Sequence, residues 1–205
     1  MAENLKNKEI IFSDEDPVES SSENENVDSN ILRPKSFNEY VGQEKIKESL
    51  SIAVKASKKR DEALDHVLFY GPPGLGKTTL SYIISNQIES NFIHTSGPAL
   101  ERPADAVGLL SNLSSKDVLF IDEIHRIPKS VEEYLYSAME DFRVDFITGS
   151  GAFAKTINLR LENFTLVGST TRPGLLSSPL RDRFGLSYHL DYYHEKDLGD
   201  IIMRS

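Results

Sequence analysis

Residues 71–78 read GPPGLGKT and directly follow a short apolar run at residues 66–70. A pattern of apolar residues at helical spacing, residues 77–88, begins where the segment ends. The segment satisfies G-x-x-x-x-G-K-[ST], and it has a predicted strand before it and a predicted helix after it. That is the context which this phosphate-binding motif requires. The sequence therefore predicts a P-loop, and with it an α/β fold.

The chemistry expected of this loop is the binding of ATP together with Mg²⁺. Exposed backbone N–H groups and the N-terminus of the helix supply positive potential for the phosphates. We expect Lys77 to pair with the β- and γ-phosphates and Thr78 to place its hydroxyl on Mg²⁺, with Thr79 close behind. Three glycines let the backbone wrap closely around the phosphates: Gly71, Gly74 and Gly76.

Two adjacent carboxylates end a second apolar run, residues 118–122, which lies about 45 residues beyond the P-loop. Ligands bind at the carboxyl ends of the strands in open α/β sheets. Asp122 is therefore predicted to hold the Mg²⁺ shell, and Glu123 to orient and activate the attacking water. A solvated turn is the alternative for such a pair, but the preceding P-loop favours the functional interpretation.

Further apolar runs alternate with helical patterns and complete the fold prediction. Strands alternating with helices indicate a doubly wound, three-layer α/β/α domain with a mainly parallel, five-stranded sheet. Between Asp141 and Asn163 the pattern breaks into alternating segments around the turn residues TGSG, which predicts an inserted β-hairpin. The other predicted strands span residues 91–95, 164–170 and 187–193, and the other predicted helices span residues 42–59 and 130–139.

Polar residues near the ends of later elements extend the expected phosphate site. Thr170 ends the 164–170 strand and is expected to touch the γ-phosphate or the attacking water, although Ser and Thr commonly end strands. Arg181 and Arg183 lie near the end of the core. One of them is expected to act as an arginine finger on the nucleotide of a neighbouring subunit. A surface salt bridge is the alternative for either.

Composition and charge exclude several other classes of protein. The chain has 205 residues and a net charge of −9, and its first 30 residues alone carry nine acidic side chains against two lysines. We predict that residues 1–30 form a disordered acidic tail. The nearly neutral remainder is not typical of a broad DNA-binding surface. No apolar run is long enough for a membrane span, no secretory signal is evident, and the lack of cysteine fits a cytoplasmic protein.

These elements occur in the order of a AAA+ ATPase, and within that superfamily the sequence closely resembles the RuvB family. Proteins of that family are hexameric motors that drive branch migration of Holliday junctions. The resemblance covers about residue 32 to the end of the chain. The segments that carry it are LRP (32–34), GQ (42–43), LDH (64–66), GPPGLGKTT (71–79), LFIDEIHR (119–126), AMED (138–141), FTL (164–166), TTR (170–172) and SPLRDRFG (178–185).

The resemblance implies residue roles that spacing alone does not give. It places Leu32 and Arg33 against the nucleotide base and ribose. It makes Arg181 the finger that acts on a neighbouring subunit, with Arg183 close enough to compete. Other positions that it associates with nucleotide binding are Glu140, Asp141, Phe142, Arg183 and Tyr193.

The resemblance also implies partners. It predicts a homo-hexamer and a RuvA-like junction-binding partner, which would dock on the hairpin of residues 141–163. The apolar contacts would be Phe146, Ile147, Ala152 and Phe153. Packing of these side chains on their own domain is the alternative.

The expected domain division follows the same resemblance. Residues 31–194 would form the large AAA+ ATPase domain, and residues 195–205 would be the start of a truncated helical lid domain. RuvB-like chains continue through the lid into a winged-helix domain that touches DNA. Holliday-junction DNA is therefore expected to be bound mainly by domains that this chain lacks.

Three functions remain open at this point. The first is the ATP-hydrolysing subunit of a branch-migration motor. The second is a nucleotide- and RuvA-binding module with little turnover, because the chain cannot form a productive ring. The third is another AAA+ ATPase of DNA metabolism, such as a clamp-loader subunit. The LRP and SPLRDRFG segments weigh against the third.

Overall fold

The computed structural model describes residues 33–148 and 155–204. The predicted tail, Leu32, Ala152 and Phe153 lie outside these residues. From Pro34 onward the described residues belong to one compact unit.

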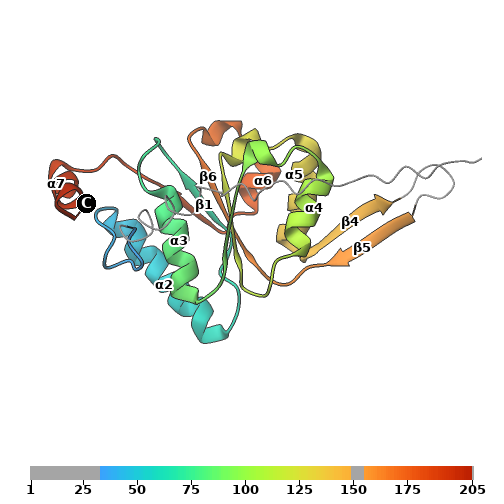
Figure 1. The fold of residues 1–205 in the computed structure, drawn as a ribbon, viewed down its shortest axis with the longest axis horizontal. Coiled ribbons are helices and arrows are strands. Elements are labelled where there is room, and N and C mark those ends of the chain that lie inside the picture. The colour runs from blue at the N-terminus through green and yellow to red at the C-terminus, as the bar shows by residue number, and fades with distance from the viewer. Residues whose placement is uncertain (1–32, 149–154, 205) are drawn as a thin grey trace, which may run out of the picture. The chain divides into compact units, whose positions relative to one another are not determined.

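A parallel sheet of five strands forms the centre of this unit, in the order β2-β3-β6-β1-β7. Helices cover both of its faces, which confirms the predicted three-layer fold (Figure 1). The strands are β1 (Val67–Tyr70), β2 (Phe92–Ser96), β3 (Val118–Asp122), β6 (Thr165–Thr170) and β7 (Leu186–His189). The α-helices are α2 (Glu44–Arg60), α3 (Lys77–Ile88), α4 (Pro103–Ser111), α5 (Lys129–Asp141), α6 (Ser178–Asp182) and α7 (Glu195–Arg204), with 3₁₀ turns η1 (Gly97–Ala99), η2 (Ile124–Arg126) and η4 (Pro173–Leu175).

Alternate side chains of the buried strands divide the core between the two helical layers. Val67 and Phe69 of β1 pack with α2 and α3, whereas Leu68 packs with α4, α5 and α6. The same alternation along β3 places Phe120 on the first face and Leu119 on the second. Because strand side chains point to opposite faces in turn, a strand that is apolar at every position is buried on both sides.

The predicted last strand is too long, because the structure ends β7 at His189 rather than at residue 193. Among the described strands, β7 pairs with β1 alone, and β1 ends at Tyr70 and turns into the P-loop. The N–H of Leu190 donates to the Tyr70 carbonyl over 2.9 Å and is the last step of this ladder. Residues 190–194 then leave the sheet and lead to α7.

Helix α4 has no counterpart among the predicted elements, because nine residues give too few turns for a clear helical period. Its start is nevertheless encoded locally. Pro103 occupies the first turn, and the Asp105 carboxylate accepts a hydrogen bond of 2.9 Å from the N–H of Arg102. Proline at the start and a side chain that satisfies a free N–H are typical helix-start signals.

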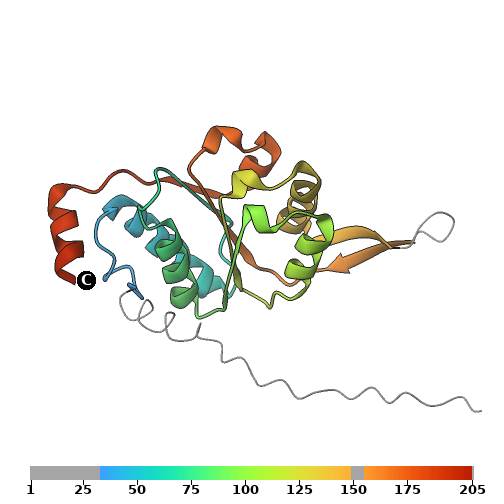
Figure 2. The ribbon, with the colours of Figure 1, turned by 45° about the horizontal axis from the view of Figure 1, so that its top comes forward.

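The predicted hairpin is confirmed as a separate antiparallel pair. Strands β4 (Arg143–Thr148) and β5 (Lys155–Arg160) pair from Arg143 with Arg160 to Thr148 with Lys155. Both views show the hairpin extending away from the sheet on the side of α4 and α5 (Figures 1 and 2). Its turn lies outside the described residues.

Among the helices that are described, none combines the length and hydropathy that a bilayer crossing requires.

A buried histidine joins the base of the sheet to α5. His66 lies just before β1; its Nδ1 accepts the N–H of Leu166 over 2.9 Å, and its Nε2 lies 3.0 Å from the Met139 carbonyl. Nδ1 is therefore the acceptor and Nε2–H the donor, so the ring is neutral. Burial lowers the pKa of His66, against smaller opposing effects of the Met139 carbonyl and Asp65.

We expect His66→Asn to lower the free energy of unfolding near neutral pH by about 1–3 kcal/mol, because the Met139 carbonyl loses its donor. The pKa of His66 is lower in the folded state than in the unfolded chain, so its stabilising effect is present above about pH 6.5 and is lost as the pH falls. The difference between the wild type and the variant should therefore shrink between about pH 7.5 and pH 5.

Denaturant unfolding at several pH values measures this difference. The exposed His94 on β2 provides the matched control substitution, His94→Asn. Unfolding free energies of the wild type and His66→Asn that fall in parallel would contradict the assignment.

Candidate nucleotide site

The P-loop connects β1 to α3 and depends on glycine at two close approaches. Gly71 has φ 142°, and a Cβ there would lie 2.5 Å from the Leu190 carbonyl oxygen. Gly76 has φ 84°, and a Cβ there would lie 2.4 Å from the Tyr40 hydroxyl. Backbone or a buried ring blocks each position, so any larger residue would displace the loop.

A cavity of about 330 Å³ lies over the P-loop, and we call it the phosphate cavity. It brings together most of the residues that the motifs predict, from the P-loop and from the end of β3. Its lining is Pro73, Gly74, Leu75, Gly76, Lys77, Thr78, Thr79, Asp122, Glu123 and Thr171.

Lys77 is bound to the P-loop itself. Its ammonium donates to the carbonyls of Gly71 over 3.0 Å and Pro72 over 2.7 Å. Burial lowers the pKa of Lys77, while the carboxylates of Asp122 and Glu123 act in the opposite direction. The ammonium thus lies in the loop with neutral acceptors only, which a charged phosphate oxygen would replace favourably.

Asp122 is fixed through one of its two carboxylate oxygens. Oδ1 accepts the Glu123 N–H over 3.0 Å and a short hydrogen bond from the Ser169 hydroxyl. Oδ2 has no hydrogen-bond partner among the described residues, so it stays available to a ligand. Ser169 has no sequence signal beyond its place near the end of a strand.

Glu123 is joined to the end of β6 through His125. Its Oε2 lies 3.3 Å from His125 Nε2, and His125 Nδ1 lies 2.8 Å from the Thr170 hydroxyl. Thr170 is fully buried and does not line the phosphate cavity, whereas the next residue, Thr171, does. The structure therefore places Thr170 behind the cavity wall, not in it. His125 was not a predicted site residue; its position two residues after Glu123 was the signal available.

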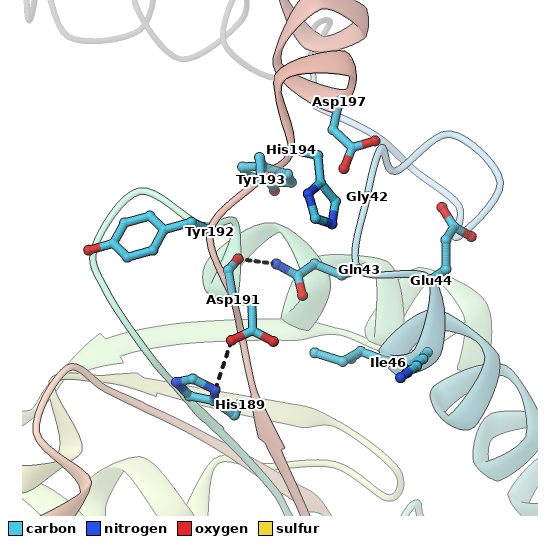
Figure 3. Close-up of a pocket in the computed structure, with 11 residues that line it drawn as sticks. Gly42, Gln43, Glu44, Ile46, His189, Asp191, Tyr192, Tyr193, His194 and Asp197 are labelled. Carbon is cyan, nitrogen blue, oxygen red and sulfur yellow. Dashed lines mark hydrogen bonds and ion pairs between the residues drawn. The ribbon is translucent and has the colours of Figure 1, made fainter.

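A second cavity of about 450 Å³ lies between the start of α2 and residues 189–197, and we call it the Tyr193 cavity (Figure 3). The Gln43 amide donates to the Asp191 carbonyl over 2.6 Å across it. Tyr192 points away from the other lining residues and is 75% exposed. Aromatic and histidine rings with scattered hydrogen-bonding groups suit an organic ring better than a phosphate, since Asp191 and Asp197 are acidic.

Tyr193 connects the two cavities. It lines the second, and its hydroxyl donates over 3.1 Å to the carbonyl of Leu75, which lines the first. The Tyr40 hydroxyl lies 2.8 Å from both the same carbonyl and the Tyr193 hydroxyl. Burial raises the pKa of both tyrosines, so these hydroxyls remain protonated donors. The predicted role of Tyr193 is thus compatible with its position, and Tyr40 is an addition to the site.

Four predicted nucleotide-binding residues lie elsewhere. Glu140 and Asp141 end α5 and Phe142 follows them; Arg183 donates to Glu140 through a short hydrogen bond. Phe142 and Arg183 share a cavity of about 390 Å³ with His66, which precedes β1. His66 precedes β1 and the P-loop follows it. This group therefore lies at the amino ends of the strands, opposite the phosphate cavity. One chain does not bring these residues to its own phosphate cavity.

The two candidate finger arginines differ in their contacts. Arg183 donates to the carbonyls of Tyr136 and Pro179 as well as to Glu140, and its guanidinium lies 5.3 Å from the centre of the Tyr136 ring. Arg181 is exposed and has no side-chain partner among the described residues. Arg183 is therefore held within its own chain, and Arg181 is free to reach another. Arg33 is the first described residue, so the pair that it forms with Leu32 remains a prediction.

Comparisons with known proteins agree with this geometry. The family model described as the Holliday junction DNA helicase RuvB P-loop domain matches residues 32–190. The chain is 57% identical over 174 residues to the Holliday junction branch migration complex subunit RuvB of Lactococcus lactis subsp. cremoris (strain SK11), with 85% of this chain and 52% of the relative covered. The same protein of subsp. lactis (strain IL1403) gives the same values.

Solved structures of a further relative also match. The P216G mutant of Thermotoga maritima RuvB superposes with a TM-score of 0.77 at 53% identity, covering 84% of this chain and 54% of that one. The structure titled as the T. maritima RuvB Holliday junction branch migration motor gives a TM-score of 0.75 at 53% identity, covering 84% and 53%. The chain spans about half the length of these relatives. The family model matches residues 32–190, well over half of the chain, and the chain therefore belongs to the family of RuvB P-loop domains.

Proposed function

We propose that this chain is the ATP-binding and ATP-hydrolysing part of a motor subunit for branch migration of Holliday junctions. The observation that carries the proposal is the phosphate cavity. It joins Lys77 and Thr78 of the P-loop to Asp122 and Glu123 of β3 in one space of about 330 Å³. Such a cavity in a RuvB-type domain suits a triphosphate with an attacking water beside it.

The residues present suit Mg²⁺ as the metal that accompanies the nucleotide. Thr78 and Asp122 supply one hydroxyl and one carboxylate to the same cavity. Among the described residues there is no group of three or more His, Cys, Asp or Glu that could hold a metal by itself. Mg²⁺ commonly takes one or two protein ligands and completes its shell with phosphate oxygens and water. When bound, it would neutralise charge that develops on the phosphates.

The catalytic roles follow from the placement of each side chain. Glu123 orients the attacking water and accepts its proton, since its carboxylate lines the cavity and is one-third exposed. Lys77 exchanges its two carbonyl partners for phosphate oxygens. Thr170 contributes from behind the wall, next to Thr171. In the Tyr193 cavity, Tyr193 and the start of α2 would hold the base, with Leu32 and Arg33 as further expected contacts.

A neighbouring copy would complete the site. Arg181 is the better finger, because Arg183 already has three acceptors in its own chain. Glu140, Asp141 and Phe142 lie on the same edge as Arg183 and would face the nucleotide of another copy. The homo-hexamer expected from the resemblance supplies such neighbours.

The partners and the domain division are proposed on the same basis. The relatives are named as subunits of a branch migration complex. A RuvA-like, junction-binding protein would dock on the β4–β5 hairpin, where Ile157 is 42% exposed and Phe146 is half-buried. Helix α7 would begin the lid, since Ile202 and Met203 expose its apolar face. Junction DNA would be bound mainly by parts of the subunit beyond this chain.

We expect Glu123→Gln to abolish ATP hydrolysis while nucleotide binding persists. The amide keeps the size of the carboxylate but accepts no proton, which should lower kcat by about 10²- to 10⁴-fold. Phosphate release and the binding of a fluorescent ATP analogue measure the two properties separately. Hydrolysis that survives the substitution would overturn the assignment of Glu123. Lys77→Ala should weaken binding itself and serves as the contrasting variant.

We expect hydrolysis per chain to rise with protein concentration, because Arg181 acts on a neighbour. Arg181→Ala should lower kcat by roughly 10³- to 10⁵-fold. Mixing Arg181→Ala chains with Glu123→Gln chains should restore part of the rate, since some interfaces then combine an intact Glu123 with an intact Arg181. A mixture that stays as inactive as its components would contradict the assignment. Arg183→Ala in place of Arg181→Ala tests the competing arginine. We expect its main effect to be a lower free energy of unfolding.

A further inference from the structure

We propose that His125 is a positioning residue that holds the Glu123 carboxylate and links its orientation to the end of β6. The inference rests on the proposed function insofar as Glu123 is the base. It concerns the chain of contacts Glu123–His125–Thr170, in which the imidazole side chain is only 7% exposed.

The hydrogen bonds around Thr170 fix the tautomer of His125. The Thr170 oxygen already accepts the N–H of Arg172 over 2.9 Å. The Thr170 proton has no other acceptor among the described residues than His125 Nδ1, 2.8 Å away, so Nδ1 is the acceptor. The ring proton then lies on Nε2, and Glu123 Oε2 lies 3.3 Å from that nitrogen. The opposite tautomer would place an imidazole lone pair against a carboxylate, which is unfavourable.

The backbone of Glu123 has little freedom, so its side chain is the adjustable part. Glu123 has φ 50°, a left-handed conformation that is uncommon outside glycine. Its N–H donates to Asp122, and its carbonyl accepts the Arg126 N–H over 2.9 Å. Gly97 packs so closely that a Cβ there would lie 2.4 Å from the Glu123 carbonyl oxygen. The direction of the carboxylate thus depends on its side-chain partner, which is His125.

The same chain of contacts reaches the wall of the phosphate cavity. Thr170 is bonded to the N–H of Arg172, and Thr171, which lies between them in sequence, lines the cavity. Thr170 lies behind the wall, so a phosphate that moves this segment shifts the donor to His125 Nδ1 without taking its proton. The imidazole follows the donor and keeps its place beside Glu123. His125 would in this way make the aim of the base depend on what occupies the cavity.

Two substitutions separate the two ends of the imidazole. The amide of Gln in His125→Gln reaches the position of Nε2 and can still donate to Glu123. The shorter amide of His125→Asn reaches only the position of Nδ1 and keeps the Thr170 contact alone. We expect His125→Asn to lower kcat by about tenfold or more, and His125→Gln to retain most of it, because only the contact with Glu123 orients the base. KM for ATP should change by less than about twofold in both, because neither touches the phosphates.

Thr170→Val completes a double-mutant cycle with His125→Asn. It removes the donor to His125 Nδ1, so adding it to His125→Asn should lower kcat by less than its effect in the wild type. The pair His94→Asn and His94→Gln on β2 controls for loss of a histidine as such. Unfolding by denaturant is measured for every variant, so that a loss of stability is not mistaken for a loss of orientation.

A second readout does not require turnover. In ¹⁵N-labelled protein without nucleotide, the His125 ring, assigned by its absence in His125→Asn, should show the neutral Nε2–H form. Thr170→Val should move its Nδ1 resonance downfield, as expected when an unprotonated ring nitrogen loses a hydrogen bond. A non-hydrolysable ATP analogue with Mg²⁺ should move the Nδ1 resonance by less than Thr170→Val does, because the Thr170 proton stays on His125 Nδ1.

The outcomes are distinct. An Nδ1–H tautomer, an unchanged Nδ1 resonance in Thr170→Val, or wild-type kcat in His125→Asn would overturn the proposal. Equal losses of stability and kcat in His125→Asn and His125→Gln would reduce His125 to a packing residue and also overturn it. If the wild type binds or hydrolyses no ATP, the proposed function fails. The ring measurements without nucleotide then still decide whether His125 links Thr170 to Glu123.

Discussion

The pairing of β6 with β1 on one side and β3 on the other determines the distance between the P-loop and the carboxylates. All six residues of β6 are buried, and it is hydrogen-bonded to both neighbours. Adjacent strands are about 4.8 Å apart, so β1 and β3 end roughly 10 Å from each other. A phosphate chain held by the loop after β1 therefore comes within reach of Asp122 at the end of β3. Gly168 in the middle of β6 allows this packing, since a Cβ there would lie 3.0 Å from Ile124 and Phe184.

Much of this arrangement could be predicted from the sequence, because its parts have local signals. The P-loop was evident from glycine spacing between a strand and a helix, and the strand before Asp122 from an unbroken apolar run. Other parts depend on contacts between distant segments. The end of β7 is set by where β1 stops, and the apposition of Tyr40, Leu75 and Tyr193 joins residues up to 153 positions apart. Thr170 was correctly placed at a strand end, yet its burial behind Thr171 follows from tertiary packing alone.

Neighbouring polar groups at the site have different degrees of freedom. Asp122 is held by a backbone N–H and the Ser169 hydroxyl, and its second oxygen remains available. Lys77 has two carbonyl acceptors that a phosphate can replace. Glu123 has a constrained backbone, and its carboxylate has one histidine partner among the residues that the structure describes. The carboxylate proposed to bind the metal is thus rigid, whereas the groups proposed to meet the reacting phosphate can exchange partners.

The opposite positions of the phosphate cavity and of Arg183 give the domain a polarity along its strands. When the Arg183 end of one copy contacts the phosphate-cavity end of the next copy, two different surfaces are joined. Such a contact is heterologous, and a single one leaves one Arg183 end and one phosphate-cavity end unpaired. Repetition of the same step either closes into a ring or continues as a helical filament, depending only on the rotation between neighbours. The number of active sites in a closed ring then equals the number of chains, and each site belongs jointly to two of them.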